Sequence, residues 1–524
     1  MQRRKFIQKS ATAAVALPVL NGLNMSAIAE GSFLHKLYIA NSAADHILVI
    51  IQMSGGNDGL NMVIPLDQYS NYYNARSNIA IAQNNVLALT GTSATGLHPS
   101  LTGLRDLYNA GQVNIVQSVG YPTPNFSHFR ATDIFMTASD QNQYLTDGWI
   151  GRYMNVDYPG YPNGYPNATN PHPLGIQYGT GTSLIMLGPT SQMGVTISDP
   201  TRVITDGGVS GDPAPATPAG DKLTYVRSIS AQSDAYGIAI KSAYNSGGTN
   251  PGVYPTGNSL ADQLKTTARL INGGLKTKIY CCNIGGFDLH SNATSVGDTS
   301  SGAHATLLQK LGDAIKAFHA DLVLMGKDNN VIGMTFSEFG RRIKSNASGG
   351  TDHGTAYPMI LFGTQVTGGI TGANPVLPAV AGVNDNIAMN IDFRSVYSSL
   401  LKRWLCESDT NTLSIMLQNF PQPNVCSNTE CLTGAPNLVP SLVRNYPNPA
   451  TNYTTVEYKT DGGHTLMQLL NINGTVLSTV MEQTFPGPAT GTQRVDMSHL
   501  HVGIYYIRFQ NGTKSQMKPV LKVN

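Results

Sequence analysis

Between residues 46 and 363 the sequence alternates short apolar runs with stretches of helical periodicity, and this alternation limits the possible folds most strongly. The apolar runs lie at 46–53, 112–120, 276–286, 331–336 and 357–363. After the third run, apolar residues recur at spacings of 3, 4, 3 and 4, namely at Leu308, Leu311, Ile315, Phe318 and Leu322. Nearly continuous apolar strands are typical of parallel sheets that helices cover on both faces. We therefore predict an α/β domain with a doubly wound, mostly parallel sheet.

The chain has 524 residues, which exceeds one typical domain and predicts two folded units. Charged residues make up only 12% of it, compared with roughly 25% in average soluble proteins. Its 33 basic and 31 acidic residues nearly balance, so nothing in its charge indicates a nucleic-acid partner. The largely uncharged, glycine-rich composition is compatible with a location outside the cytoplasm.

Residues 1–29 have the pattern of an export signal. Arg3 and Arg4 precede an apolar stretch at 11–20, and small residues predict cleavage after Ala29. The paired arginines resemble a twin-arginine signal, which implies the twin-arginine machinery as a partner. The alternative is an amphipathic first helix of the mature fold. The apolar stretch is shorter than the roughly 20 residues that span a bilayer, so we expect no transmembrane segment in the mature protein.

The amino-acid composition changes near residue 432, where a segment rich in Pro, Asn and Gly predicts a linker at 433–441. From 442 to 524, short alternating runs separated by turns such as Asn473-Gly474 predict a small all-β sandwich. Its pieces "NYPNPA", "GIYYIRF" and "MKPVLKVN" resemble the type A C-terminal sorting domain of the type IX secretion system of Bacteroidota. This resemblance implies passage through the periplasm to the cell surface or medium. A carbohydrate-binding sandwich is the alternative.

The five cysteines cannot all pair within the chain. Cys426 and Cys431 are close enough in sequence to close a small loop, with Cys406 as a competing partner. Cys281 and Cys282 lie inside an apolar run and are expected to be buried small hydrophobic residues rather than ligands.

Acidic and histidine residues follow several predicted strands. In open α/β sheets the functional crevice lies beyond the carboxyl ends of the strands, so we expect these side chains to converge. They occur on five separate stretches, as Asp58, then Ser127 and His128, then Asp288 and His290, then Glu338, and finally Asp352 and His353.

Oxygen and nitrogen ligands of this kind suit hard or borderline divalent cations. Without a cation, so many carboxylates in one crevice would repel one another. Two ions roughly 3.5 to 4 Å apart stabilise the attacking and leaving oxygens of an ester displacement. We therefore predict one or two divalent ions, with Zn, Mn, Mg and Ca not distinguished. The predicted ligands or supporting residues are Asp58, Asp288, His290, Glu338, Asp352 and His353.

Ser127 is the predicted nucleophile, with His128 as its catalytic neighbour, because a helix predicted to start here favours negative charge. Arg130 and Arg341 are expected to hold the oxyanions of an anionic ester substrate, with Arg342 as a weaker candidate.

Several of these residues also have purely structural interpretations. Asp58 can satisfy a turn, Ser127 can cap a helix, His128 can pack in a core, and Glu338 can pair with Arg341. The remaining predicted structural or exposed histidines are His46, His98, His304 and His319.

Five motifs, "MSGGNDGLN", "PNFSHF", "GGFDLHSN", "MTFSEFGRR" and "GGTDHGTAYPMILFG", resemble in this order the bacterial DUF1501 family over most of residues 45–405. That family is grouped with the alkaline phosphatase and sulfatase superfamily. The resemblance implies an alkaline-phosphatase-like α/β domain at 30–432. In it Asp58 would be the first-strand aspartate, Ser127 the nucleophile, and Asp288 with His290 a ligand pair. Glu338 would be an acidic ligand and His353 the late histidine.

These features together predict an exported, metal-dependent hydrolase of phosphate or sulfate esters. One alternative is a non-catalytic surface protein that keeps the fold and binds glycans or proteins. A structural surface-layer component without metal is another. Residues 155–260, which include a predicted helix at 230–246, carry no predicted chemistry.

Overall fold

The computed structural model describes residues 46–201, 213–427, 431, 441–460, 463–485, 489–511 and 514–524. The predicted signal at 1–29 lies outside these residues, as does nearly all of the predicted linker. The chain divides into two compact units, residues 1–428 and 429–524. Within the described residues, no helix is both long enough and apolar enough to cross a bilayer.

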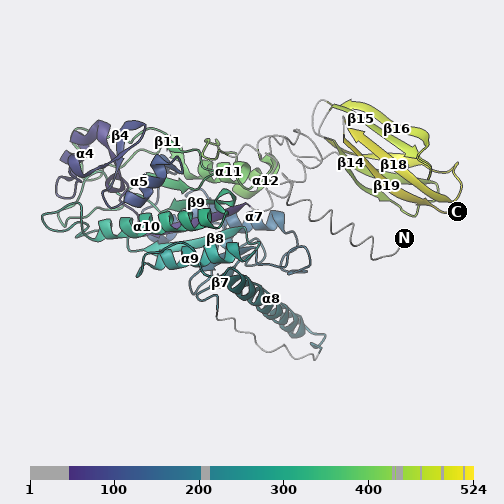
Figure 1. Ribbon diagram of the computed structural model, residues 1–524, viewed down its shortest axis with the longest axis horizontal. Coiled ribbons are helices and arrows are strands. Elements are labelled where there is room, and N and C mark those ends of the chain that lie inside the picture. The colour runs from purple at the N-terminus through teal and green to yellow at the C-terminus, as the bar shows by residue number, and fades with distance from the viewer. Residues whose placement is uncertain are drawn as a thin grey trace. The chain divides into compact units, whose positions relative to one another are not determined.

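A nine-stranded sheet forms the centre of the first unit (Figure 1). Its order is β11-β5-β10-β9-β1-β8-β6-β7, and β12 also pairs with β5. The strands are β1 Ile47–Ser54, β5 Val113–Gly120, β6 Gly175–Tyr178, β7 Val195–Ile197, β8 Ile279–Gly285, β9 Val331–Phe336, β10 Tyr357–Phe362, β11 Gly369–Thr371 and β12 Ile391–Asp392. All pairs are parallel except those that β10 makes with β5 and β9. The predicted α/β class with a mostly parallel sheet is confirmed.

Helices cover both faces of this sheet because its strands are apolar on both sides. Val49 and Ile51 of β1 belong to one core, whereas Leu48 and Ile50 belong to the other. The first core includes residues of α5, α8, α9 and α10, and α9 lies beside α10 in Figure 1. The bounds of these helices are α5 Thr102–Asn109, α8 Pro218–Ser246, α9 Ser259–Asn272 and α10 Ala303–Leu324. The second core contains α6 His128–Thr137, α7 Trp149–Asp157, α11 Phe393–Arg403 and α12 Asp409–Met416.

A smaller layer follows the carboxyl end of β1. It comprises the short helices α3 Gly59–Met62 and α4 Tyr69–Arg76 and a three-stranded sheet of β2 Val63–Pro65, β3 Leu87–Leu89 and β4 Thr92–Leu97. Its own apolar cluster includes Leu60, Ile64 and Tyr72.

The direction of β10 determines which loops meet. Because β10 runs antiparallel to β9, its first residue lies at the edge where β9 and β1 end. The segment 337–356, which joins β9 to β10, therefore leaves and re-enters the sheet at one edge. The sequence predicted a strand here but not its reversed direction.

The second unit is a sandwich of two antiparallel sheets around one apolar core, as predicted. One sheet contains β13 Ser441–Tyr446, β14 Tyr453–Thr460 and β17 Ala489–Asp496. The other contains β15 Gly463–Leu470, β16 Val476–Phe485, β18 Gly503–Asn511 and β19 Lys514–Lys522. The predicted Asn473-Gly474 turn is present between β15 and β16, and Gly474 has a positive φ of 81°.

Of the cysteines considered for a disulfide, the competing partner Cys406 is bonded and Cys426 is not. Cys406 and Cys431 are the disulfide-bonded cysteines, whereas Cys426 is free and buried. Val425 and Cys426 pack into the second core, and burial raises the pKa of the Cys426 thiol to about 12. A thiol held there as a small hydrophobic side chain is unavailable to Cys431.

Glu407, between α11 and α12, gives the fold a pH dependence. Burial, and to a lesser extent the charge of the neighbouring Asp157, raises the pKa of Glu407 to about 7. The Oε2 atom of Glu407 accepts a hydrogen bond from Asn411 Nδ2 at 2.7 Å. The neutral form therefore stabilises the fold, fully below the ordinary pKa of 4.5, and this contribution is lost as the pH rises through 7. Because of Glu407, the free energy of unfolding of the wild type should fall by about 2 kcal/mol between pH 5 and pH 8, and Glu407→Gln should abolish this fall. Denaturant unfolding at the two pH values measures it. An unchanged pH slope would contradict the role of Glu407.

Candidate metal centre

A glycine turn at the end of β1 allows the chain segments of the site to approach closely. Gly55 and Gly56 have positive φ values of 122° and 74°, which favour glycine. A Cβ on Gly55 would lie 2.3 Å from the backbone nitrogen of Asp288. The Gly55 N–H also donates to Glu338 Oε1 at 2.8 Å. The turn after β1, the loop after β8 and the loop after β9 therefore meet, as the sequence predicted for the carboxyl ends of these strands.

Three imidazole rings surround one carboxylate oxygen. Asp288 Oδ1 lies 3.5 Å from His128 Nε2, 3.1 Å from His290 Nε2 and 3.5 Å from His353 Nε2. His128, Asp288 and His353 each offer a ligand atom within 4.8 Å of the others, and His290 Nε2 is 2.9 Å from His353 Nε2. Arg341 donates to the same Asp288 oxygen at 2.7 Å.

The outer nitrogen of each ring contacts an oxygen. His128 Nδ1 lies 2.8 Å from Glu338 Oε1, His290 Nδ1 lies 3.3 Å from Asp352 Oδ1, and His353 Nδ1 lies 2.7 Å from the Phe126 carbonyl. A carbonyl or an ionised carboxylate can only accept, so this network assigns the proton to each Nδ1. In the neutral form that binds metals, the Nε2 atom of such a ring carries the free lone pair, and in all three rings this atom faces Asp288.

This donor set fits a divalent cation. The inward atoms are acceptors that face one another, and His128 Nε2 is buried without a hydrogen-bond partner in the described part of the chain. Ligands of one tetrahedral zinc ion, bonded at 2.0 to 2.1 Å, lie roughly 3.3 Å apart, close to the separations from Asp288 Oδ1. Outer acceptors that orient histidines are also typical of metal sites.

The charges around the centre keep its donors in the required forms. Burial raises the pKa of Asp288, but its hydrogen bond and ion pair with Arg341 outweigh this effect, so the pKa lies below its ordinary value. Burial lowers the pKa of His353, which favours its neutral form. An ionised carboxylate and a neutral imidazole are the forms that bind metals.

Six predicted site residues are brought together: His128, Asp288, His290, Glu338, Asp352 and His353. Within this group, Glu338 and Asp352 contact the outer nitrogens of His128 and His290. They are therefore placed to orient these rings, as supporting residues do. His128, predicted as a catalytic residue, instead presents a nitrogen to Asp288. Glu338 contacts His128 and Gly55, whereas Arg341 pairs with Asp288, so the Glu338–Arg341 ion pair considered as a structural alternative is not the arrangement observed.

Asp58 is not among them. Both of its carboxylate oxygens lie 2.7 Å from Arg76 Nη1, and both side chains are buried. Burial raises the pKa of Asp58, but Arg76 and other nearby cationic groups hold it below its ordinary value. The predicted ligand is therefore a buried ion-pair partner, because Arg76 already neutralises its charge.

The two predicted substrate-binding arginines also have internal partners. Arg341 donates to the carbonyls of Gly56 and Thr351 in addition to Asp288, so its donors orient the centre. Arg130 is buried, and its Nη2 contacts the carbonyls of Asp140, Gln141 and Gln143. Arg130 thus fixes a loop instead of facing the centre.

Ser127 precedes the first residue of α6 and is exposed. Its side chain makes no cap hydrogen bond, so the structural role predicted as an alternative is not observed. Its position is one residue from His128.

Sequence reasoning missed Arg76 and the Phe126 carbonyl. Arg76 is the only charged residue between Asp67 and Arg105, and an isolated charge in a polar stretch was a usable signal. The Phe126 carbonyl has no signal, because any residue supplies the same oxygen.

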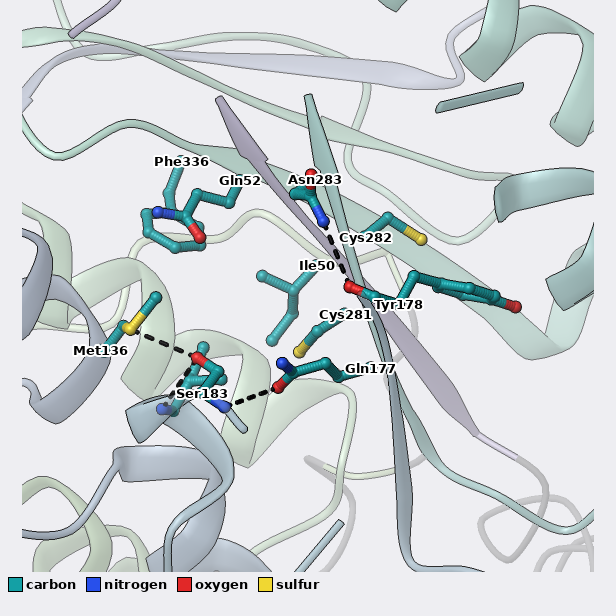
Figure 2. A pocket seen from close by; sticks show the side chains of 11 residues that line it. Ile50, Gln52, Met136, Gln177, Tyr178, Ser183, Cys281, Cys282, Asn283 and Phe336 are labelled. Atoms are coloured by element: carbon teal, nitrogen blue, oxygen red, sulfur yellow. Dashed lines mark hydrogen bonds between the residues drawn. The ribbon is translucent and has the colours of Figure 1, made fainter. Parts of the chain in front are cut away.

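A small open pocket lies against β1, β6 and β8 (Figure 2). It is lined by the amides of Gln52, Gln177 and Asn283 and by Cys281, and none of the candidate metal ligands lines it. Burial raises the pKa of the Cys281 thiol to about 12, so Cys281 remains a neutral thiol there.

Comparison with known families confirms both predicted resemblances over part of the chain. Residues 239–392 match the family described as "Protein of unknown function (DUF1501)", and residues 444–523 match "Secretion system C-terminal sorting domain". The first match includes Asp288, His290, Glu338 and His353, but it begins at residue 239 and so covers less than half of the predicted 45–405. The sorting domain indicates a secreted or cell-surface protein.

No curated protein matches the chain. Among solved structures, a Bacteroides thetaiotaomicron protein described under the metabolism of multiple glycosaminoglycans is 11% identical, with TM-score 0.35, over 91% of this chain and 89% of that chain. The lipoteichoic acid synthase LtaP of Listeria monocytogenes is 9% identical, with TM-score 0.29, over 83% and 87%. A Pseudoalteromonas sp. sulfatase is 9% identical, with TM-score 0.32, over 87% and 85%. Likenesses this remote do not identify an activity.

Proposed function

We propose that the first unit is a metal-dependent hydrolase of phosphate or sulfate esters that acts outside the cytoplasm with Ser127 as nucleophile. The observation that carries this proposal is the convergence of three histidine Nε2 atoms on the carboxylate of Asp288. Three imidazole nitrogens and one carboxylate oxygen favour zinc over magnesium or calcium, which prefer oxygen ligands.

A divalent ion held by His128, Asp288, His290 and His353 would supply Lewis-acid polarisation of an ester oxygen. The residues of the chain prepare that site. Glu338 and Asp352 maintain the tautomers of His128 and His290, and Arg341 keeps Asp288 ionised and oriented. The side chains of Asp288 and His290 are 49% and 45% exposed, so an ester can approach from solvent.

Ser127 lies where an anionic ester would be attracted. It immediately precedes the ten-residue helix α6. The N–H groups in the first turn of a helix have no acceptor within the helix, and in α6 this turn lies next to Ser127. The N-terminus of a helix stabilises negative charge on a substrate or on a serine oxygen. An exposed hydroxyl without a cap bond can approach the ester without first breaking an internal contact.

Ser127→Ala tests this role. It should lower turnover of nitrophenyl phosphate or nitrophenyl sulfate by about 1,000-fold while the metal content stays unchanged. Steady-state kinetics and elemental analysis of the full chain measure the two quantities. Ser77→Ala is the control, because Ser77 is also an exposed serine at a helix end. Wild-type turnover in Ser127→Ala would exclude the serine nucleophile.

One observation favours the non-catalytic alternative. The donors of Arg341 and Arg130 are used within the protein, so neither is presented to an anionic ester. Stoichiometric metal without turnover of any aryl phosphate, phosphodiester or sulfate would favour a binding protein.

A further inference from the structure

Phe339 is a buried phenylalanine that packs against the candidate metal centre. Its side chain is 0% exposed, yet Phe339 belongs to none of the four apolar clusters formed by the described residues. The centroid of its ring lies 4.8 Å from that of His128 and 4.4 Å from that of His353. The two imidazole centroids are 4.5 Å apart, so the three rings are in mutual contact. The burial of Phe339 therefore serves the centre.

The backbone on the carboxyl side of Phe339 and the turn after β1 fix the position of its ring. Gly340 donates its N–H to the Thr355 carbonyl at 2.8 Å, and its own carbonyl accepts from the Gly354 N–H at 2.8 Å. In the turn after β1, a Cβ on Gly56 would lie 2.3 Å from the Cε2 atom of Phe339, so the ring fills the space beside this glycine. A ring held in this way limits the rotation of the imidazoles that pack on it.

The centre has a covered half and an open half. The side chains of His128 and His353, which contact Phe339, are 32% and 22% exposed, whereas those of Asp288 and His290 are 49% and 45% exposed. A phenyl ring offers water no conventional hydrogen bond. Additional water ligands would therefore reach a bound ion from the half formed by Asp288 and His290.

A centre with one covered half discriminates between metal ions. Zinc is satisfied by four ligands and sometimes takes a fifth, whereas magnesium, manganese and calcium take roughly six or more, mostly oxygen atoms. Three imidazole nitrogens and one carboxylate oxygen supply four ligands. An ion that needs six would have to add at least two waters, and the covered half leaves less room for them.

We propose that Phe339 is a positioning residue that makes the centre selective for a four- or five-coordinate ion. This inference rests on the metal centre of the proposed function and adds what selects its metal. Phe339 acts through His128 and His353. Its ring keeps both imidazoles turned toward Asp288 and excludes water from their covered flank.

Metal affinity and the visible absorption of bound cobalt(II) test this role in the full chain. The wild type should show the intense visible absorption of four- or five-coordinate cobalt(II). Phe339→Leu and Phe339→Met keep an apolar side chain without a flat ring, and both should weaken this absorption. Each should also raise the Kd for zinc at least tenfold, as the loss of groups that orient ligands typically does, while the Kd for manganese stays the same or falls.

Phe318→Leu is the matched control. Phe318 is also 0% exposed, but it lies on α10 and packs in the first apolar core. Its loss should destabilise the fold while the cobalt spectrum and both Kd values stay unchanged. Denaturant unfolding of the metal-free chains compares the variants. A loss of stability in the Phe339 variants with an unchanged spectrum and unchanged Kd values would overturn the proposal.

If neither Phe339 variant folds, the wild-type spectrum decides, because weak absorption from six-coordinate cobalt(II) would overturn the proposal. Two other outcomes separate this inference from the proposed function. Metal preference that depends on Phe339, without turnover of nitrophenyl esters, supports the role of Phe339 and contradicts the hydrolase. Metal-dependent turnover with unchanged metal preference in both variants does the reverse. A wild type that binds no metal would overturn both.

Discussion

Asp288→Ala should lower the affinity of the full chain for zinc at least 100-fold and abolish ester turnover. All three histidine Nε2 atoms approach Asp288 Oδ1, so its removal takes away the anionic donor that the described residues place at their centre. Loss of an outer residue that merely orients a ligand typically costs 10- to 100-fold in affinity, and loss of a ligand should cost more. Isothermal titration with zinc and elemental analysis after dialysis measure the effect.

Asp106→Ala is the matched control for this experiment. Asp106 is a 40% exposed carboxylate paired with Lys316, and it lies on α5. Its loss should leave zinc affinity within twofold of the wild type. If Asp288→Ala retains wild-type metal content after dialysis, the histidines and Asp288 do not form the metal centre. Asp288→Asn, which keeps the shape but removes the charge, should fall between the two.

Arg76→Met should destabilise the first unit by about 3 to 5 kcal/mol, because it leaves the Asp58 carboxylate buried without a partner. The Arg76 side chain is fully buried, and it also donates to the carbonyls of Arg342 and Ile343. The arginine therefore connects the turn after β1 to the segment that carries Arg341. Denaturant unfolding followed by circular dichroism measures the loss.

The double variant Arg76→Met with Asp58→Asn separates the charge from the packing. It should recover part of the loss, since a neutral amide costs less to bury than an unpaired carboxylate. Because the folded pKa of Asp58 lies below its ordinary value of 3.8, the ion pair contributes fully above that pH, and the contribution is lost as the pH falls through the folded pKa. A loss smaller than 1 kcal/mol in Arg76→Met at pH 7 would exclude this role.

The apolar runs were sufficient to predict the sheet, because strands buried on both faces leave a continuous apolar pattern. The rule that loops meet at the carboxyl ends then predicted that Asp288, His290 and Glu338 lie together. His353 obeys the same geometry only because β10 is reversed, which places the start of this strand at the edge where β9 and β1 end. Strand direction leaves no mark in residue composition, so it could not be predicted.

Asp58 shows why position alone was insufficient. It follows β1 as predicted, yet its carboxylate meets Arg76 of α4, and a contact with a separate layer cannot be read from strand ends. The role of His128 depends in the same way on Glu338, 210 residues later in the chain. Side-chain direction, which decides between ligand and ion pair, requires the packed structure.

Because β10 is reversed, one continuous segment of the chain supplies several residues of the centre. Both ends of segment 337–356 are anchored in adjacent strands, and this one excursion supplies Glu338, Arg341, Asp352 and His353. Exchange of a single contiguous stretch between homologous chains would therefore transplant half of the centre at once. Changes confined to this stretch would alter the candidate centre with little disturbance to the two apolar cores that cover the faces of the sheet.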